Sequence, residues 1–111
     1  MTSTEGGTSR GACIVLTTEA DRVAADRVAS ALIDGHVAAC VTMHPVRSMY
    51  RWQGTVHDTD EVQLVVKTMA GAVDDVIAVI VDHHSYEMPE VLVLEARAGA
   101  DYGAWIGEVV V

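Results

Sequence analysis

The chain has 111 residues, a formal net charge of −9 and an apolar fraction of 50%. A second hydrophobic core would leave each half too small to be stable alone, so the length favours one domain. The negative charge argues against nucleic acid and anionic membranes as partners, because both are bound through clustered Lys and Arg. No run approaches the roughly 18 apolar residues of a membrane span, and the first residues have no signal-peptide pattern. We therefore expect a cytoplasmic protein.

Residues 1–11 are rich in Ser, Thr and Gly and lack periodicity, so we expect a flexible tail followed by one folded domain over residues 12–111. "ACIVLTT" is a β-branched run that predicts the first strand. Thr18 and Asp21 form a Thr-x-x-Asp capping signal for a helix. Gly35 is expected to end that helix in a left-handed conformation. The helix shows an apolar stripe at helical spacing, made of Ala25, Val28, Ala29, Leu32 and Ile33.

Residues 36–68 contain two extended runs that are separated by Gln53–Gly54, where glycine allows the positive φ of a hairpin turn. Pro45 predicts a bend or an edge position in the first run, because proline cannot donate to a ladder. A hairpin of this length projects beyond its own core as an arm. Its alternation places Tyr50 and Trp52 on one face.

Helical periodicity returns in "GAVDDVIAVIVDHH", which predicts a second helix that ends at His83 and His84. Its stripe contains Val73, Val76, Ile77, Ile80, Val81 and His84. "EVLVLEA" is apolar on both faces and predicts a central strand, and "GADYGAWIGEVV" predicts a short terminal helix. The order β-α-β-β-α-β is that of an α+β, ferredoxin-like split βαβ sandwich with two helices on one face of an antiparallel sheet.

The apolar surface exceeds what so small a domain can bury, so we expect a homo-oligomer with the C-terminal valines as a candidate contact. The two cysteines, Cys13 and Cys40, match no Cys-x-x-Cys spacing and are expected to be free thiols in a reducing compartment.

His83 and His84 either cap the second helix or supply imidazole ligands. Pro89 turns the chain toward the last strand and places Glu90 at its start. Imidazole and carboxylate suit Cu(II) or Zn(II), but two such ligands need a third donor. The residues alone leave both interpretations open.

The other candidate side chains do not form a catalytic set. Glu61 and Lys67 share one strand face but lie about 20 Å apart, so they cannot form a pair within one strand. Tyr50 and Trp52 either pack or stack on a ligand, and His44, His57 and Glu87 are expected at the rim. The sequence has no Gly-rich phosphate loop, no Gly-x-Ser-x-Gly elbow and no His-Glu-x-x-His helix. We therefore expect a protein that is not an enzyme and has no organic cofactor.

The blocks "IVLTTEAD", "AACVTMHP", "SMYRWQGTV", "DEVQLVVKT" and "HHSYEMPEVLVL" resemble, in order, those of the CutA divalent-cation-tolerance proteins. The resemblance covers about residues 12–108. It implies a ferredoxin-like homotrimer with an intersubunit cleft similar in shape to that of PII signalling proteins, and a role in the response to metal ions with copper binding.

The resemblance assigns a metal-binding role to His83, His84 and Glu90, and a place in the cleft to six further residues. These are Cys40, Tyr50, Trp52, Glu61, Lys67 and Tyr86. Two positions depart from the family pattern. Thr17 stands where a copper-binding member has a cysteine, which removes a thiolate ligand. Ser85 replaces a proline and is expected to loosen the turn. The alternatives are a PII-like sensor of a small anion, a hydrolase of the acylphosphatase type, and a structural trimer without a ligand.

Overall fold

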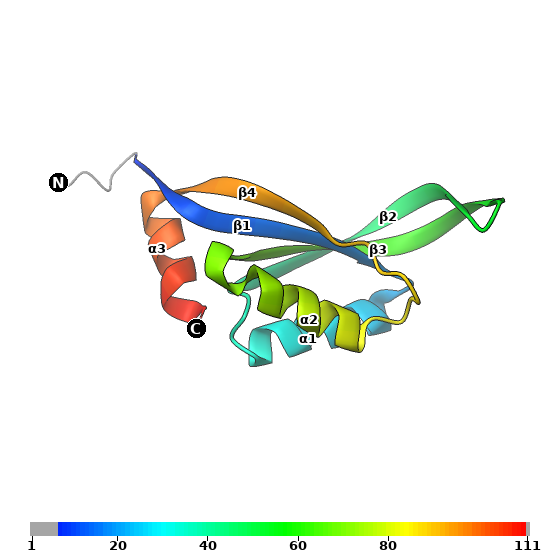
Figure 1. The fold of residues 1–111 in the computed structure, drawn as a ribbon, viewed down its shortest axis with the longest axis horizontal. Helices are drawn as coiled ribbons and strands as arrows, with labels where there is room; N and C mark the ends of the chain where they lie inside the picture. The colour runs from blue at the N-terminus through cyan, green and yellow to red at the C-terminus, as the bar shows by residue number, and fades with distance from the viewer. Residues whose placement is uncertain (1–6, 111) are drawn as a thin grey trace.

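The computed structural model describes residues 7–110, which form one four-stranded antiparallel sheet in the order β2-β3-β1-β4 (Figure 1). The elements are β1 (Thr8–Glu19), α1 (Arg22–Asp34), β2 (Cys40–Trp52), β3 (Thr55–Met69), the 3-10 turn η1 (Ala70–Ala72), α2 (Val73–His83), β4 (Leu92–Gly99) and α3 (Ala100–Val109). Helices α1 and α2 cover the same face of the sheet, and α3 lies at the end where β1 starts. The α+β, ferredoxin-like fold with a terminal helix is confirmed. None of the helices in residues 7–110 has the length and apolarity to cross a membrane.

The core lies between the sheet and the two helices on that face. Val15 of β1, Val28 and Leu32 of α1, and Val76 and Ile80 of α2 have no exposed surface. The helical spacing thus identified the inward residues, with two exceptions. Ile33 is 42% exposed and Val81 is 59% exposed, because each stands at the margin of its helix stripe.

Strand β1 begins at Thr8, inside the segment 1–11 that was expected to be a tail. The added residues pair with the end of β4, as Thr8 with Gly99 and Ser9 with Ala98. The register shifts between Ser9 and Ala12, where Gly11 has φ of +97°. Pairing with β4 therefore makes the start of β1 a strand, although the composition of this segment does not predict one. Residues 1–6 of the expected tail and Val111 of the terminal valines lie outside the described residues.

The boundaries of α1 differ from the sequence prediction at both ends. The N-cap is Asp21 rather than Thr18, and its carboxylate accepts a hydrogen bond of 2.9 Å from the N–H of Ala24. Gly35 has φ of −79°, and the positive φ falls on His36 at +58°. The backbone keeps a right-handed helical conformation at Gly35, and the left-handed residue is the next one, His36. The glycine signal located the helix end but not the residue that turns.

The long arm is confirmed. Strands β2 and β3 pair continuously from Cys40–Lys67 to Trp52–Thr55, and the molecule measures 55 × 24 × 20 Å (Figure 1). Both turn residues have positive φ, +50° at Gln53 and +79° at Gly54, as a tight hairpin requires. Strand β2 has a free edge, which is why Pro45 can stand within it.

The prediction that the last strand is central was wrong, because β4 is an edge strand beside β1. Its apolar residues are open to solvent in the single chain, with Leu92 54%, Val93 44% and Leu94 50% exposed. A strand that is apolar on both faces is expected to be buried on both, but the pattern does not predict which part of the protein covers each face. Within residues 7–110 of the single chain, these side chains stay largely uncovered.

Candidate ligand cleft

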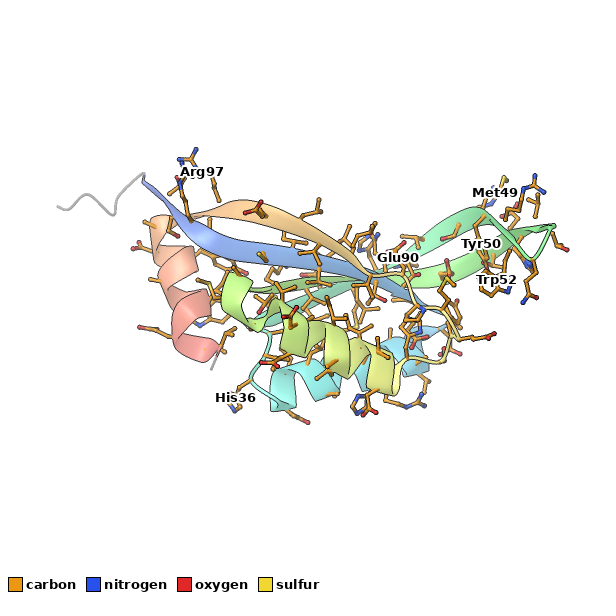
Figure 2. The ribbon with its side chains drawn as sticks, viewed as in Figure 1. His36, Met49, Tyr50, Trp52, Glu90 and Arg97 are labelled. Carbon is orange, nitrogen blue, oxygen red and sulfur yellow. The ribbon has the colours of Figure 1, made fainter. Side chains whose placement is uncertain are left out.

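A cleft of about 750 Å³ opens where the arm leaves the body of the molecule. One wall comes from the arm and includes Tyr50, Trp52 and Glu61. The other wall is formed by residues 85–90, which belong to the loop that connects α2 to β4. Figure 2 shows Tyr50 and Trp52 on the same side of the arm, as the alternation of the strand predicts. Tyr50 also stacks on His57 across the hairpin, at a centroid distance of 5.2 Å.

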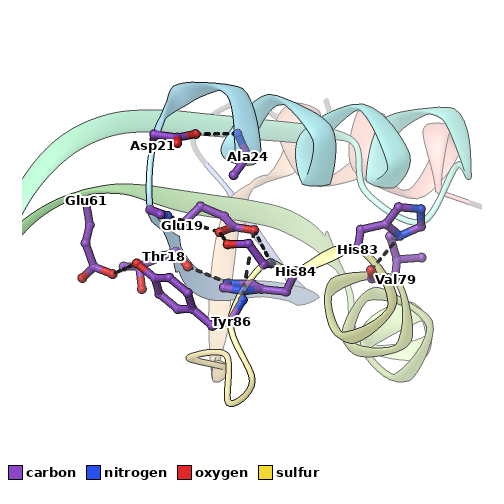
Figure 3. Close-up of polar contacts among 11 residues, drawn as sticks. Thr18, Glu19, Asp21, Ala24, Glu61, Val79, His83, His84 and Tyr86 are labelled. Atoms are coloured by element: carbon purple, nitrogen blue, oxygen red, sulfur yellow. Dashed lines mark hydrogen bonds and ion pairs between the residues drawn. The ribbon is translucent and has the colours of Figure 1, made fainter. Parts of the chain in front are cut away.

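The loop is held in place by Glu19, a residue that the sequence analysis did not single out. Its side chain is completely buried at the end of β1. Its carboxylate accepts hydrogen bonds from the N–H of Ser85, at 3.0 Å, and from the Ser85 hydroxyl (Figure 3). These hydrogen bonds constrain the turn at Ser85, which the sequence analysis expected to be looser than a turn with proline. A glutamate at the end of an apolar strand was the available signal.

His84 also helps to hold the loop in place. Its Nε2 lies 2.6 Å from the carbonyl oxygen of Thr18, to which it must donate, and its Nδ1 accepts from the N–H of Tyr86 at 3.0 Å (Figure 3). The Nδ1 atom is also 3.6 Å from Glu19, but its lone pair is already taken by the Tyr86 N–H. The side chain is fully buried. In this arrangement neither ring nitrogen has a lone pair left for a metal.

His83 caps α2. Its Nδ1 lies 3.0 Å from the carbonyl oxygen of Val79 and donates to it, so the ring satisfies one of the free carbonyls in the last turn. The side chain is 37% exposed and is not part of the cleft wall. In Figure 3 the His83 ring lies beside α2, apart from the Glu61–Tyr86 contact. Capping through Nδ1 leaves Nε2 as the nitrogen that can coordinate a metal.

Two carboxylates meet in the cleft. The hydroxyl of Tyr86 donates to Glu61 Oε2 at 2.5 Å, and burial together with this hydrogen bond raises the pKa of Tyr86 far above its usual range. Burial, and then the charge of Glu61, raise the pKa of Glu90. Within residues 7–110, Glu90 Oε2 is buried and has no hydrogen-bond partner. Glu90 is therefore the uncompensated group of the cleft.

Cys40 and Lys67, which were expected in the cleft, lie apart from it. They pair across the ladder of β2 and β3, and Lys67 Nζ bonds the Thr42 hydroxyl and lies 3.7 Å from Cys40 Sγ. Neither residue lines the cleft. The other four residues that were expected in the cleft do line it, namely Tyr50, Trp52, Glu61 and Tyr86.

One chain does not bring a full metal-binding set together. Across residues 7–110, no three His, Cys, Asp or Glu side chains are grouped closely enough to hold an ion. Thr17, at the position of the missing thiolate, is fully buried, and its hydroxyl has no partner among the same residues. Among the described residues, His83 and Glu90 therefore have no third His, Cys, Asp or Glu beside them to complete a site.

The fold and the cleft define a small ferredoxin-like protein with a projecting hairpin arm and an acidic, aromatic-lined cleft at its base. Residues 13–109 match the family model described as CutA1 divalent ion tolerance protein. The chain belongs to this family, which confirms the resemblance seen in the sequence.

Individual relatives agree over nearly the whole chain. The divalent-cation tolerance protein CutA of Pectobacterium atrosepticum is 35% identical over 97 residues, which cover 86% of this chain and 88% of that protein. The crystal structure of CutA from Xylella fastidiosa has a TM-score of 0.87 and 32% identity, and covers 91% of this chain and 99% of its own. The Archaeoglobus fulgidus structure, described as a periplasmic divalent cation tolerance protein, has a TM-score of 0.87 and 27% identity over 90% of this chain and 99% of its own.

Proposed function

We propose that the chain is a homotrimeric divalent-cation-tolerance protein that acts by binding, not by catalysis, and that holds a divalent metal ion such as Cu(II) weakly at a cleft between subunits. The observation that carries the proposal is the buried Oε2 of Glu90, which has no hydrogen-bond partner within residues 7–110 and lies in the cleft that Glu61 also lines. An uncompensated anion of this kind favours a cation.

The sheet supplies the argument for assembly. Leu92 and Leu94 of β4 pair in the ladder with Leu16 and Ile14 of β1, so these four apolar side chains share one face. It is the face opposite to Val15, which is buried in the core with residues of α1 and α2, and these two helices cover that side of the sheet (Figure 1). An apolar sheet face and free edges at β2 and β4 are a template for pairing with other copies. The family resemblance supplies the number of three subunits. The two free edges of the sheet differ, so one edge of each subunit can pair with the other edge of the next subunit until the ring closes.

The proposed metal donors are Glu90 in the cleft, His83 through Nε2, although His83 is not part of the cleft wall of its own chain, and a group from a neighbouring subunit. His84 joins this set only if its two hydrogen bonds to the backbone of Thr18 and Tyr86 are broken. We therefore expect His83 and Glu90 to contribute more than His84. Such an incomplete, partly oxygen-based site without a thiolate is expected to bind weakly.

Calorimetric titration of Cu(II) into the wild type and three variants tests the assignment. We expect His83→Ala and Glu90→Gln to weaken binding, whereas His36→Ala leaves it unchanged. His36 is the matched control, since it lies at the end of α1 remote from the cleft (Figure 2). Equal affinity in all four proteins, with assembly intact, would mean that His83 is a helix cap and nothing more.

The alternative is a PII-like sensor of a small anion with no metal function. Over the part of the chain that the structure describes, the walls of the cleft contain no lysine, arginine or histidine, and Lys67 is bound to Thr42 outside it. This lining disfavours nucleotides and carboxylates. A thermal-shift comparison of nucleotides and dicarboxylates with divalent metals separates the two functions, because only the occupied class raises the melting temperature.

We propose the cytoplasm as the location. Cys13 and Cys40 are both free thiols, which suits a reducing compartment, although the Archaeoglobus relative is described as periplasmic. Cell fractionation of the untagged protein distinguishes the two compartments.

A further inference from the structure

We propose that the cleft at the base of the arm binds a small aliphatic diamine or polyamine through its protonated amino groups. This inference goes beyond the proposed metal function. It shares the Glu90 carboxylate with that function, but it uses neither histidine and needs no metal.

The negative charge of the cleft predicts a positively charged ligand. Among the described residues of the single chain, the lining of the cleft includes the carboxylates of Glu61, Glu87 and Glu90 and no basic side chain. Across residues 7–110, no protein donor reaches the buried Oε2 of Glu90. Because a buried carboxylate without a partner is costly, a bound cation offsets a free-energy cost that the unliganded chain carries.

The size and walls of the cleft favour an organic cation over a bare ion. A volume of about 750 Å³ is in the range of small-molecule sites, which is roughly 300–1,000 Å³, and far exceeds a single ion. The rings of Tyr50 and Trp52 form one wall, and Met88 and Pro89 belong to the other. Such walls contact methylene groups, and the ring faces attract a nearby ammonium.

The hydrogen bonding of Glu61 distinguishes an ammonium from a guanidinium. One of its carboxylate oxygens is already occupied by the Tyr86 hydroxyl. The hydroxyl takes one of the roughly four lone-pair sites of the carboxylate, so the paired hydrogen bonds of a guanidinium fork meet more competition at Glu61 than a single hydrogen bond does. A compact ammonium needs only one acceptor. A second amino group at the other end of the ligand can face Glu87 or Glu90.

The test uses three ligands of equal chain length that differ in charge. We expect 1,5-diaminopentane to bind, and pentane-1,5-diol and glutarate to bind far more weakly. Binding is followed by Trp52 fluorescence in the assembled Trp105→Phe variant, because Trp105 of α3 is the other tryptophan of the chain. A chelator is present throughout, so that the result is independent of any metal site.

We expect Glu90→Gln to lower the diamine affinity by about tenfold or more, in keeping with the loss of a charge-assisted contact. The matched control is Glu108→Gln, which removes the same charge from exposed α3 at the other end of the molecule (Figure 1). Glu61→Gln is a second variant of the cleft in case Glu90→Gln fails to assemble. The proposal is overturned if glutarate or the diol binds as well as the diamine. It is equally overturned if the control loses as much affinity as the cleft variants, or if no diamine binding is detected.

Discussion

Ser85 is bound to the carboxylate of Glu19 by two hydrogen bonds, one from its backbone N–H at 3.0 Å and one from its hydroxyl. The two residues are 66 positions apart in the sequence. Glu19 ends β1, and Ser85 begins the loop that forms one wall of the cleft. The position of that wall therefore depends on a buried anion in the neighbouring strand.

Replacing Glu19 by alanine is expected to lower the free energy of unfolding by on the order of 3 kcal/mol, because the Ser85 N–H then loses a charged acceptor. Glu19→Gln should cost much less, since a glutamine side chain accepts from the N–H and donates to the hydroxyl. Urea denaturation at a fixed subunit concentration measures both values. If the alanine and glutamine variants are equally stable, these hydrogen bonds do not hold the loop.

The contact between Tyr86 and Glu61 makes a second prediction. Tyr86→Phe removes the donor to a carboxylate whose residue is only 6% exposed, and we expect a loss of about 1–3 kcal/mol in unfolding free energy. Tyr50→Phe is the control. Tyr50 lines the same cleft but is 40% exposed, so loss of its hydroxyl should change stability by about 0.5 kcal/mol or less. Similar losses in both variants would contradict a specific role for the Glu61 contact.

Whether a feature could be predicted from the sequence depends on how far apart in the chain its interacting residues lie. The arm, the helix stripes and the separation of Glu61 from Lys67 depend on repeat distances within one element, and each was predicted. The role of Glu19 and the engagement of both His84 nitrogens depend on partners distant in the chain. No local pattern contains that information.

The error on β4 has a different cause. A run of residues that is apolar on both faces indicates that both faces are covered, and the sequence analysis assumed that the same chain covers them. The exposed Leu92 and Leu94 show that it does not. The composition had already indicated an excess of apolar surface, and β4 is one place where this excess is found.

Glu90 should make stability depend on pH. Burial and the charge of Glu61 raise its pKa in the folded protein, so folding favours the protonated form. The stabilisation from that proton is complete below the ordinary glutamate pKa of about 4.3 and is lost as the pH rises through the higher folded value. Glu90→Gln has no such loss. We therefore expect the variant to exceed the wild type in unfolding free energy at pH 7, and the difference to shrink toward pH 4.

Denaturation curves of the two proteins between pH 4 and pH 7 test this expectation, at one subunit concentration and without added metal or amine. Parallel pH profiles would show that Glu90 is already compensated in the assembled protein, for example by a neighbouring subunit. In that event the same result would also remove the electrostatic basis of cation binding in the cleft.

Assembly is tested by a charge on the helix-free face of the sheet. Leu94 is 50% exposed in the single chain and shares its face with Leu92 and Ile14. Leu94→Lys would bury an ammonium in the proposed interface without a partner, which is costly, so we expect sedimentation velocity to detect monomers. Val23→Lys is the control, because Val23 is 70% exposed on α1 and a lysine there stays in water. A trimer that survives Leu94→Lys would place the interface elsewhere, whereas a wild-type monomer at micromolar concentration would refute the trimer itself.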